Sequence, residues 1–372
     1  MTDSAELRTT PLAPIHAELG ARMTAFAGTE MPLRYGSELA EHRAVRERAG
    51  LFDLSHMAEI EVTGPRAAAA LDFALASEPS RQTPGRARYS LLLAEDGGIL
   101  DDLIVYRLAE ERFLVVANAG NRETAVRALR ERAEDFDAPV VDRSDEFALL
   151  AVQGPASQAV LEETEGLSLS EGLPAGLGYY RIAVGSFQGE ELLLARTGYT
   201  GEDGFELYLP AGLGVPLWRA LSAAGEAHGL LPCGLACRDT LRLEAGMPLY
   251  GHELSASIKP AQAGLGRVVA AAKAGDFVGR AALAADDGSD ARVLVGLVGA
   301  ERRAGREGYP VRRGEREIGV VTSGALSPTL GVPIAMAYVD RESAEPGTRL
   351  EIDARGKALP VAVAELPFYT RG

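Results

Sequence analysis

The chain has 372 residues, and two or three domains are expected because one compact core seldom exceeds about 250–300 residues. Hydrophobic residues make up 47% and charged residues 24%, an ordinary balance for a folded globular protein. The formal net charge of −15 argues against nucleic-acid binding, which needs a concentrated basic face, and no apolar run is long enough to cross a membrane.

The first 145 residues alternate between helical and extended patterns. Capped or amphipathic segments predict helices at 39–49, 65–76 and 121–132. Alternating apolar segments predict strands at 57–64, 88–93, 99–107 and 113–117, with a turn at 94–98.

A second set of strands and helices follows. Strands are expected at 147–153, 179–184, 191–195 and 205–209, and helices at 155–162, 215–224 and 237–244. Strands outnumber helices and form antiparallel hairpins, which indicates the α+β fold class rather than a doubly wound α/β fold.

The composition changes at 283–291, a stretch of small and polar residues that is typical of a linker. Beyond it only strands are expected, at 293–298, 317–324, 334–339, 349–353 and 359–364. Short strands at regular spacing predict a small antiparallel barrel.

Several common functional signals are missing. The start of the chain has early acids and no apolar core, so no targeting segment is expected and the cytoplasm is the expected location. Cys233 and Cys237 have a C-x3-C spacing without a nearby histidine, which favours buried free thiols. The five histidines are scattered and no phosphate loop or dinucleotide fingerprint is present, so no metal site is expected.

The segment 97–105, GGILDDLIV, places two neighbouring carboxylates inside an otherwise apolar strand. Because neighbours on a strand point to opposite faces, either Asp101 or Asp102 must enter an apolar environment or a cavity. Burial raises the pKa of a carboxyl group, which suits a general base. The alternative is an aspartate that caps the hairpin beside the two glycines.

The segment 196–206, RTGYTGEDGFE, is a polar loop whose last residue, Glu206, begins an apolar strand. A carboxylate in this position can bind a guanidine-like edge, such as that of a pterin or guanine, through two parallel hydrogen bonds. The alternative is a wide hairpin loop with solvated acids.

Charged side chains also follow one helix near residue 240. Arg238, Asp239 and Arg242 have the spacing of helical neighbours, so they form an ion ladder or present an arginine to an anion or to Glu206. The later segment 318–331 is rich in Ser, Thr, Pro and Gly and has no titratable group, so shape and backbone contacts are expected of it rather than chemistry.

Together these motifs resemble the glycine cleavage T-protein family. The resemblance rests on DLSHM at 53–57, GGILDDLIV, VANAGN at 116–121, RTGYTGEDGFE and the 318–331 segment, which occur in the family's order. It implies an α+β, three-domain, cloverleaf-like folate-binding fold with a C-terminal antiparallel β-barrel. The expected boundaries are a folate-binding region at 1–285, built from two intertwined subdomains (1–50 with 145–245, and 51–144 with 246–285), and a barrel domain at 290–372.

The resemblance implies an aminomethyltransferase of the glycine cleavage system. Such an enzyme transfers the methylene of the aminomethyl group on dihydrolipoyl H-protein to tetrahydrofolate, and it releases ammonia and 5,10-methylenetetrahydrofolate. Tetrahydrofolate is thus the expected co-substrate and the lipoylated H-protein the expected partner. By resemblance, Asp102 is the catalytic carboxylate that takes a proton near folate N5 or N10. The other matching family positions are expected to bind folate: Glu206, Arg238, Met57, Tyr89, Asn118, Tyr180, Tyr199 and Arg371.

This chain departs from the family pattern near residue 262. Gln262 and Arg267 stand where the family usually has an acid and a tryptophan, and this stretch lines the channel or contacts the partner in the family. Since H-proteins are acidic as a class, docking should use a basic patch. The candidates are clustered arginines, with a solvated loop as the alternative: Arg302, Arg303, Arg306, Arg312 and Arg313.

Two other activities share this fold. A folate-dependent demethylase module usually follows a dinucleotide-binding domain, for which this chain has no fingerprint, so a stand-alone demethylase of a small methylated substrate is the form of this alternative that stays open. A non-catalytic folate-binding protein that assists iron–sulfur cluster assembly would show a Lys-Gly-Cys-x-x-Gly-Gln-Glu signature and tends to lose the catalytic acid. The chain lacks that signature and keeps Asp102.

Overall fold

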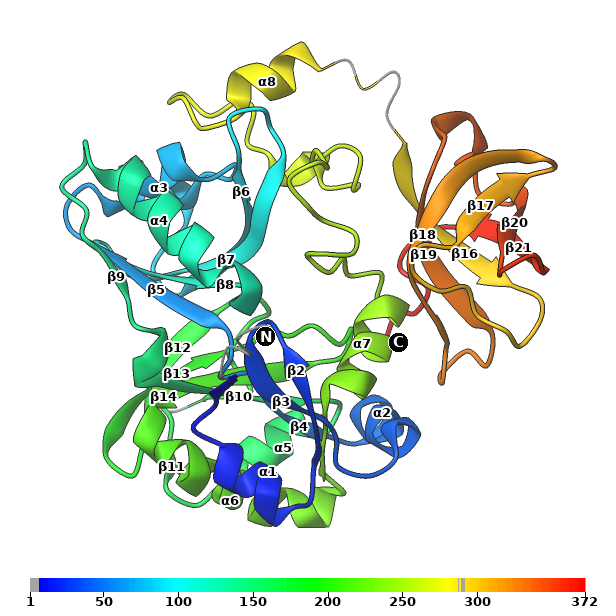
Figure 1. The fold of residues 1–372 in the computed structure, drawn as a ribbon. Coiled ribbons are helices and arrows are strands. Elements are labelled where there is room, and N and C mark those ends of the chain that lie inside the picture. Colours follow the sequence, from blue (N-terminus) through cyan, green and yellow to red (C-terminus); the bar gives the residue numbers. More distant parts are fainter. Residues whose placement is uncertain (1–6, 171, 287, 289–291, 372) are drawn as a thin grey trace, which may run out of the picture. The chain divides into compact units, whose positions relative to one another are not determined.

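The computed structural model describes residues 7–170, 172–286, 288 and 292–371 (Figure 1). The chain divides into two compact units, and it passes from one to the other several times. Unit 1 is Met1–Ala70, Pro79–Arg88 and Ile104–Arg238, and unit 2 is Leu71–Glu78, Tyr89–Leu103 and Asp239–Gly372. The domain boundaries expected from the sequence stay a prediction.

A seven-stranded sheet, in the order β11-β12-β13-β14-β10-β4-β15, forms the centre of unit 1. Its central strands β10 (Phe147–Gln153) and β14 (Gly204–Pro210) pair antiparallel along their whole length. The other strands are β4 (Gly50–Asp53), β11 (Leu167–Ser168), β12 (Ile182–Phe187), β13 (Glu190–Ala195) and β15 (Leu231–Pro232). Helices of the same unit are α1 (Ala13–Glu18), α2 (Glu38–Glu47), α5 (Ser157–Glu162) and α6 (Gly214–Gly225), and α7 (Leu235–Glu244) runs on into unit 2.

The two faces of this sheet differ in character. Phe205, Leu207 and Leu209 of β14 belong to an apolar core that also contains Trp218 of α6. Because side chains alternate along a strand, Glu206 and Tyr208 point to the opposite face. The alternation of β14 therefore places one carboxylate and one phenol away from the core.

A second sheet has the order β6-β7-β8-β5-β9. Its strands are β6 (Arg86–Leu93), β7 (Ile99–Ala109), β8 (Arg112–Ala117), β5 (Ala58–Thr63) and β9 (Val140–Asp142). In unit 1, Ile104 lies opposite Val116, which lies opposite Glu59, so these three residues form one cross-strand row. Helix α4 (Arg122–Ala133) packs along β9, α3 (Ala67–Ala74) follows β5, and β1 (Arg8–Thr9), β3 (Thr29–Arg34) and β2 (Arg22–Phe26) form a small separate sheet.

The two glycines before β7, Gly97 and Gly98, are required for different structural reasons. Gly97 has φ of +85°, a conformation that side chains other than glycine seldom adopt. A Cβ on Gly98 would lie 1.9 Å from the carbonyl oxygen of Ala256, so only glycine fits there. The Ile99 N–H donates to the Ile258 carbonyl at 3.0 Å, which holds the segment around residue 257 against this hairpin.

The C-terminal strands of unit 2 close into a barrel in the order β16-β19-β18-β17-β20-β21, coloured orange to red in Figure 1. Their bounds are β16 (Val293–Gly299), β17 (Pro310–Arg313), β18 (Arg316–Leu326), β19 (Pro333–Val339), β20 (Arg349–Asp353) and β21 (Ala358–Ala364). Alternate residues such as Val295, Ile318 and Leu350 fill the interior. The antiparallel barrel expected from the sequence is confirmed.

Several predicted elements differ from the structure. The strand expected at 179–184 begins only at Ile182, because Tyr180 has φ of +58° and donates its N–H to the Arg196 carbonyl instead. The linker expected at 283–291 begins inside helix α8 (Arg280–Ala285), and residues 287 and 289–291 lie outside the described part. Strand β17 was not expected, since its short Pro-started segment carries two arginines.

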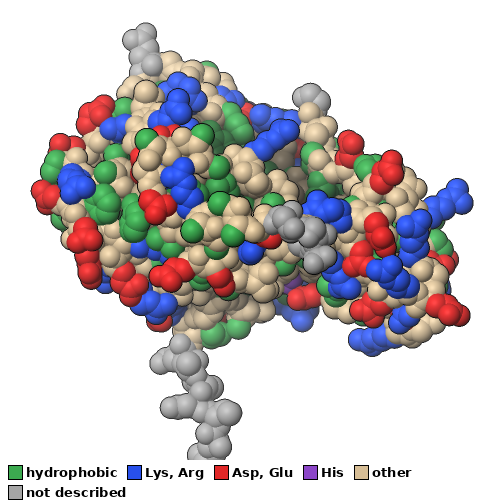
Figure 2. Space-filling view, turned by 90° about the horizontal axis from the view of Figure 1, so that it is seen from above, with side chains coloured by type: hydrophobic (Ala, Val, Ile, Leu, Met, Phe, Trp, Pro, Cys, Tyr) green, Lys and Arg blue, Asp and Glu red, His purple; other side chains and the backbone are tan. Residues whose placement is uncertain are grey.

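The surface carries charges of both signs. Figure 2 shows Lys or Arg side chains interspersed with Asp and Glu over the face in view, so the acidic excess is not gathered into one patch there. Among the described residues, no helix has the length and apolar character needed to cross a membrane.

Candidate active site

The two neighbouring aspartates of β7 have different environments. Asp101 is completely buried, whereas Asp102 is partly exposed. The Tyr89 Oη donates to Asp102 Oδ2 at 2.9 Å, from the adjacent strand β6 of the same unit. Asp102 therefore combines access with a fixed orientation, which are the properties that a proton acceptor needs.

A second tyrosine lies close to this pair of carboxylates. Tyr250 and Tyr89 pack against the same apolar cluster, which includes Leu93 and Ile99. Burial and the negative charges of Asp101 and Asp102 raise the pKa of Tyr250. Its phenol therefore keeps its proton at neutral pH and can act only as a neutral hydrogen-bonding group.

Glu206 of unit 1 is held by three hydroxyl groups. Its Oε2 accepts from Thr197 Oγ1 at 2.5 Å, from Tyr106 Oη at 3.2 Å and from Tyr208 Oη at 3.3 Å. Burial and the charge of Glu206 raise the pKa values of Tyr106 and Tyr208 well above the usual range, so both remain donors. All three donors meet the same oxygen, so Oε1 lies outside this cluster of hydroxyl groups and can accept hydrogen bonds from other groups.

Arg238 lies beside two rings in the same unit. Its guanidinium carbon is 4.8 Å from the centre of the Tyr199 ring, within the range of a cation–π interaction. His56 is buried, and within the described part of the chain neither of its ring nitrogens has a hydrogen-bond partner. Burial and the charge of Arg238 lower the pKa of His56 to about 3, so this imidazole is neutral.

The remaining predicted residues occupy different surroundings. Met57 and Asn118 are partly exposed neighbours just outside β5 and β8, where Ala58 pairs with Ala117. Tyr180 has the positive φ already noted, a strained backbone of the kind that persists when the surroundings hold it. Arg371 is exposed near the end of unit 2.

The sequence did not identify the hydroxyl groups around Glu206. Tyr106 shares one side of β7 with Ile104, Thr197 follows β13, and Tyr208 follows Glu206 by one alternation of β14. The period of two in these strands could have indicated Tyr208, because it falls on the face of Glu206. No local pattern connects Tyr106 or Thr197 to Glu206.

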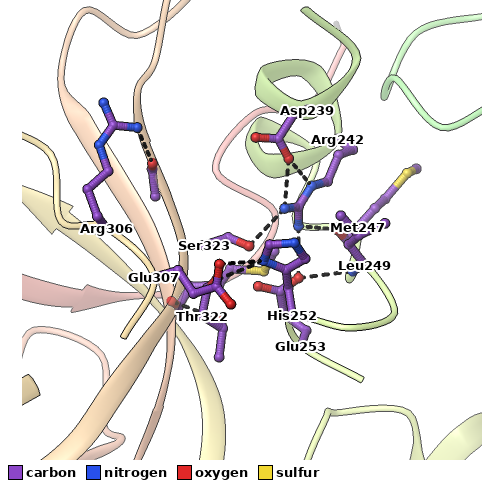
Figure 3. A network of polar contacts seen from close by, with 12 residues as sticks. Asp239, Arg242, Met247, Leu249, His252, Glu253, Arg306, Glu307, Thr322 and Ser323 are labelled. Carbon is purple, nitrogen blue, oxygen red and sulfur yellow. Dashed lines mark hydrogen bonds and ion pairs between the residues drawn. The ribbon is translucent and has the colours of Figure 1, made fainter. Parts of the chain in front are cut away.

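Arg242 of α7 is the centre of a buried polar network in unit 2 (Figure 3). Its Nη1 donates to Glu253 Oε2 at 2.9 Å and to the Met247 carbonyl at 3.2 Å. Its Nη2 donates to Ser323 Oγ of the barrel at 2.8 Å, and its Nε donates to Asp239 Oδ1 at 2.9 Å. The ion ladder considered from the sequence exists between Asp239 and Arg242, and Arg242 also holds the following loop.

The end of the same helix anchors the 318–331 segment. Glu244 is completely buried, and it accepts hydrogen bonds from Ser327 Oγ, from the Thr329 N–H at 3.0 Å and from Thr329 Oγ1 at 2.7 Å. Gln262 accepts from the Lys259 N–H at 2.9 Å and donates to the Arg292 carbonyl at 3.3 Å, while Arg267 is exposed. Gln262 therefore supports the backbone.

Comparison with known proteins decides the family. Residues 12–273 match the GCVT N-terminal domain, and residues 292–370 match the glycine cleavage T-protein C-terminal barrel domain. The chain belongs to the glycine cleavage T-protein family. The family expected from the sequence is thereby confirmed.

Relatives of this T-protein family member match it over nearly their whole length. The chain is 59% identical to the aminomethyltransferase of Streptomyces coelicolor, over 99% of both chains, and 55% identical to that of Cutibacterium acnes, over 98% and 99%. A crystal structure of the glycine cleavage system aminomethyltransferase T from Bartonella henselae is 40% identical, with a TM-score of 0.90 and 98% of both chains covered. The α+β fold class is confirmed, and the demethylase and iron–sulfur alternatives are not favoured.

Proposed function

We propose that this protein is the aminomethyltransferase of a glycine cleavage system and acts in the cytoplasm on tetrahydrofolate and aminomethyl-loaded H-protein. The observation that supports this most directly is the partly exposed Asp102 carboxylate, oriented by Tyr89 at 2.9 Å. The names of the relatives agree with this activity.

The residues present fit a reduced folate. Its pterin edge carries neighbouring N–H donors. Glu206 would accept from this edge through Oε1, because Oε2 already accepts from Thr197, Tyr106 and Tyr208. Arg238 would receive negative charge or orient Glu206, and Tyr199 restricts its movement. Bound tetrahydrofolate would supply the two nitrogens, N5 and N10, that take over the methylene.

Asp102 would act as the proton acceptor in this transfer. Forming the two new C–N bonds releases one proton from each folate nitrogen, and breaking the C–N and C–S bonds of the aminomethyl group requires one proton for ammonia and one for the thiol. A carboxylate beside the reacting nitrogens can accept these protons in turn and return them to the leaving groups. Tyr89 holds Asp102 in one orientation by its hydrogen bond.

Product formation from aminomethyl-loaded H-protein, with and without tetrahydrofolate, tests this function. Asp102→Asn should lower turnover about 10²- to 10⁴-fold, the usual contribution of a positioned base, and leave tetrahydrofolate binding within a few-fold. Glu95→Gln, an exposed acid on the same hairpin, should change neither value. Full activity in Asp102→Asn would refute the assignment of the base, and tetrahydrofolate-independent release of ammonia would refute the transferase.

Barrel arginines would form the docking surface for the acidic H-protein. Arg302, Arg303 and Arg313 are exposed, and none of them has an acidic partner among the described residues. The neighbouring Arg316, by contrast, is neutralised by Asp340 and Glu342. Two acidic proteins repel each other at long range. Arginines without an acidic partner would supply the local attraction that docking needs.

A further inference from the structure

Glu59 is a buried acid whose carboxyl group is incompletely hydrogen-bonded. It is 1% exposed, and its Oε1 has no hydrogen-bond partner among the residues that the structure describes. Its N–H donates to Ser144 Oγ at 3.0 Å and its carbonyl accepts from the Arg143 N–H at 2.9 Å, and the backbone of Glu59 also interacts with its own carboxyl group. Buried polar atoms are normally satisfied, so an incompletely bonded carboxyl group calls for an explanation outside the fold.

The strand register places Glu59 among the proposed folate contacts. On the same sheet face, Glu59, Val116 and Ile104 form one row, and Met57 and Asn118 lie at the next row beyond the pairing of Ala58 with Ala117. The row on the other side contains Tyr106, which pairs across from Leu114 and hydrogen-bonds to Glu206. Glu59 therefore lies between two groups of residues assigned to the ligand.

The surroundings of Glu59 disfavour its ionised form. Arg122 of α4 attracts a carboxylate, but it is already paired with Asp142 at 2.8 Å and with Asp145 at 2.7 Å. Burial is the largest influence and raises the pKa of Glu59 well above its usual value, against the attraction of Arg122 and with the repulsion of Asp142. The fourth neighbour, Tyr208, is a neutral phenol whose own pKa is raised in part by Glu59.

We propose that Glu59 is a further ligand-binding residue of the folate site, where its carboxyl group donates a hydrogen bond to an uncharged polar edge of the ligand. This inference rests on the proposed function. Glu206 and Glu59 then have complementary roles, because one presents an acceptor oxygen to the ligand and the other a donor. A neutral acid selects a carbonyl or an unprotonated ring nitrogen, since an amino group would offer it no acceptor.

Two substitutions separate a donor from a carboxylate. Glu59→Gln keeps a donor of similar shape, so tetrahydrofolate should bind within about 3-fold of wild type. Glu59→Leu removes the donor and should weaken binding roughly 10- to 100-fold, the effect of leaving one buried ligand group unpaired. Titration calorimetry with tetrahydrofolate measures both values. A large loss in Glu59→Gln, or wild-type affinity in Glu59→Leu, would overturn the inference.

Thermal unfolding separates ligand binding from a structural role. Glu59→Leu should have an unchanged or higher midpoint, because it replaces an incompletely bonded buried acid with an apolar side chain. The gain should be larger at pH 8 than at pH 5: the raised pKa means that the unfolded chain ionises Glu59 first, so the wild type loses stability as pH rises. A lower midpoint or an unfolded Glu59→Leu would identify a structural residue and overturn the inference.

Glu61 provides the matched control on the same strand face, because it shares the row of Leu114 and Tyr106 but its carboxylate is already paired with arginines. Its carboxylate is paired with Arg112 at 2.6 Å and Arg143 at 3.4 Å, so Glu61→Leu should lower the midpoint and leave the affinity for tetrahydrofolate unchanged. If the wild-type protein does not bind tetrahydrofolate, the proposed function fails and this inference fails with it. If the wild type binds and Glu59→Leu binds equally well, only the inference about Glu59 fails.

Discussion

The buried pair of Arg242 and Glu253 allows a quantitative test of what holds unit 2 together. Arg242 is 1% exposed and Glu253 is completely buried, with 2.9 Å between Nη1 and Oε2. Arg242→Met leaves the Glu253 carboxylate without its cation, and breaking a buried pair from one side costs about 3–5 kcal/mol. At about 2–4 °C per kcal/mol for a unit of this size, the melting temperature should fall by about 6–20 °C.

The double variant Arg242→Met/Glu253→Met removes both charges together. It should regain most of the loss, because two apolar side chains of similar volume are tolerated where one unpaired charge is not. About 1–2 kcal/mol should remain lost, since the Met247 carbonyl and Ser323 Oγ lose the guanidinium as well. Arg316→Met is the control: this exposed arginine pairs with Asp340 and Glu342, and its loss should cost less than about 1 kcal/mol.

Denaturant and thermal unfolding of the full chain, followed by circular dichroism, give these free energies. The reasoning fails if Arg242→Met costs less than about 1 kcal/mol, because a buried carboxylate would then need no partner. It also fails if the double variant loses the sum of the two single variants, since the two side chains would then stabilise the fold independently.

Three further outcomes are expected. The double substitution Arg302→Glu/Arg303→Glu should raise the apparent KM for H-protein and leave the affinity for tetrahydrofolate unchanged. Arg219→Glu, which reverses the charge of an arginine on α6, is the control and should leave that KM unchanged. An unaltered KM in the double variant would dismiss the docking surface. Lys273→Met should lower the free energy of unfolding by about 2–4 kcal/mol in a urea titration, because Nζ donates to the carbonyls of Asp72, Leu75 and Ser77 at 2.6–2.7 Å. An unchanged midpoint would show that water can replace the ammonium group. Tyr106→Phe should weaken tetrahydrofolate binding about 3- to 10-fold by removing one donor from Glu206, and equal affinity would argue against the role given to Glu206.

The sequence predicted those parts of the structure in which the signal is local. The barrel strands are short apolar-rich segments at regular spacing, and all five strands expected from them are present in the barrel. The two neighbouring aspartates in an apolar strand indicated that one carboxyl group is buried, and the structure buries Asp101 while Asp102 stays partly exposed. These features depend on the residues themselves and their immediate neighbours.

The contacts that complete the site depend on residues far apart in the chain. Tyr106 meets Glu206 across 100 positions, and Thr197 meets Tyr106 across 91. Neither pairing follows from periodicity, because it requires the relative placement of two different sheets. Tyr180 was wrongly placed in a strand for a related reason: its left-handed backbone is imposed by hydrogen bonds to Arg196 and Ala87, which no local propensity reveals.

The last turn of helix α7 has a consequence for the modularity of the chain. Arg242 and Glu244, two residues apart, are bonded to Ser323, Ser327 and Thr329 of the C-terminal domain. A truncation near residue 290 would therefore deprive a buried cation and a buried anion of their hydroxyl partners. The barrel matches a sequence family of its own, but its hydroxyl groups complete the hydrogen bonding of this helix. Neither part is therefore expected to fold when it is expressed alone.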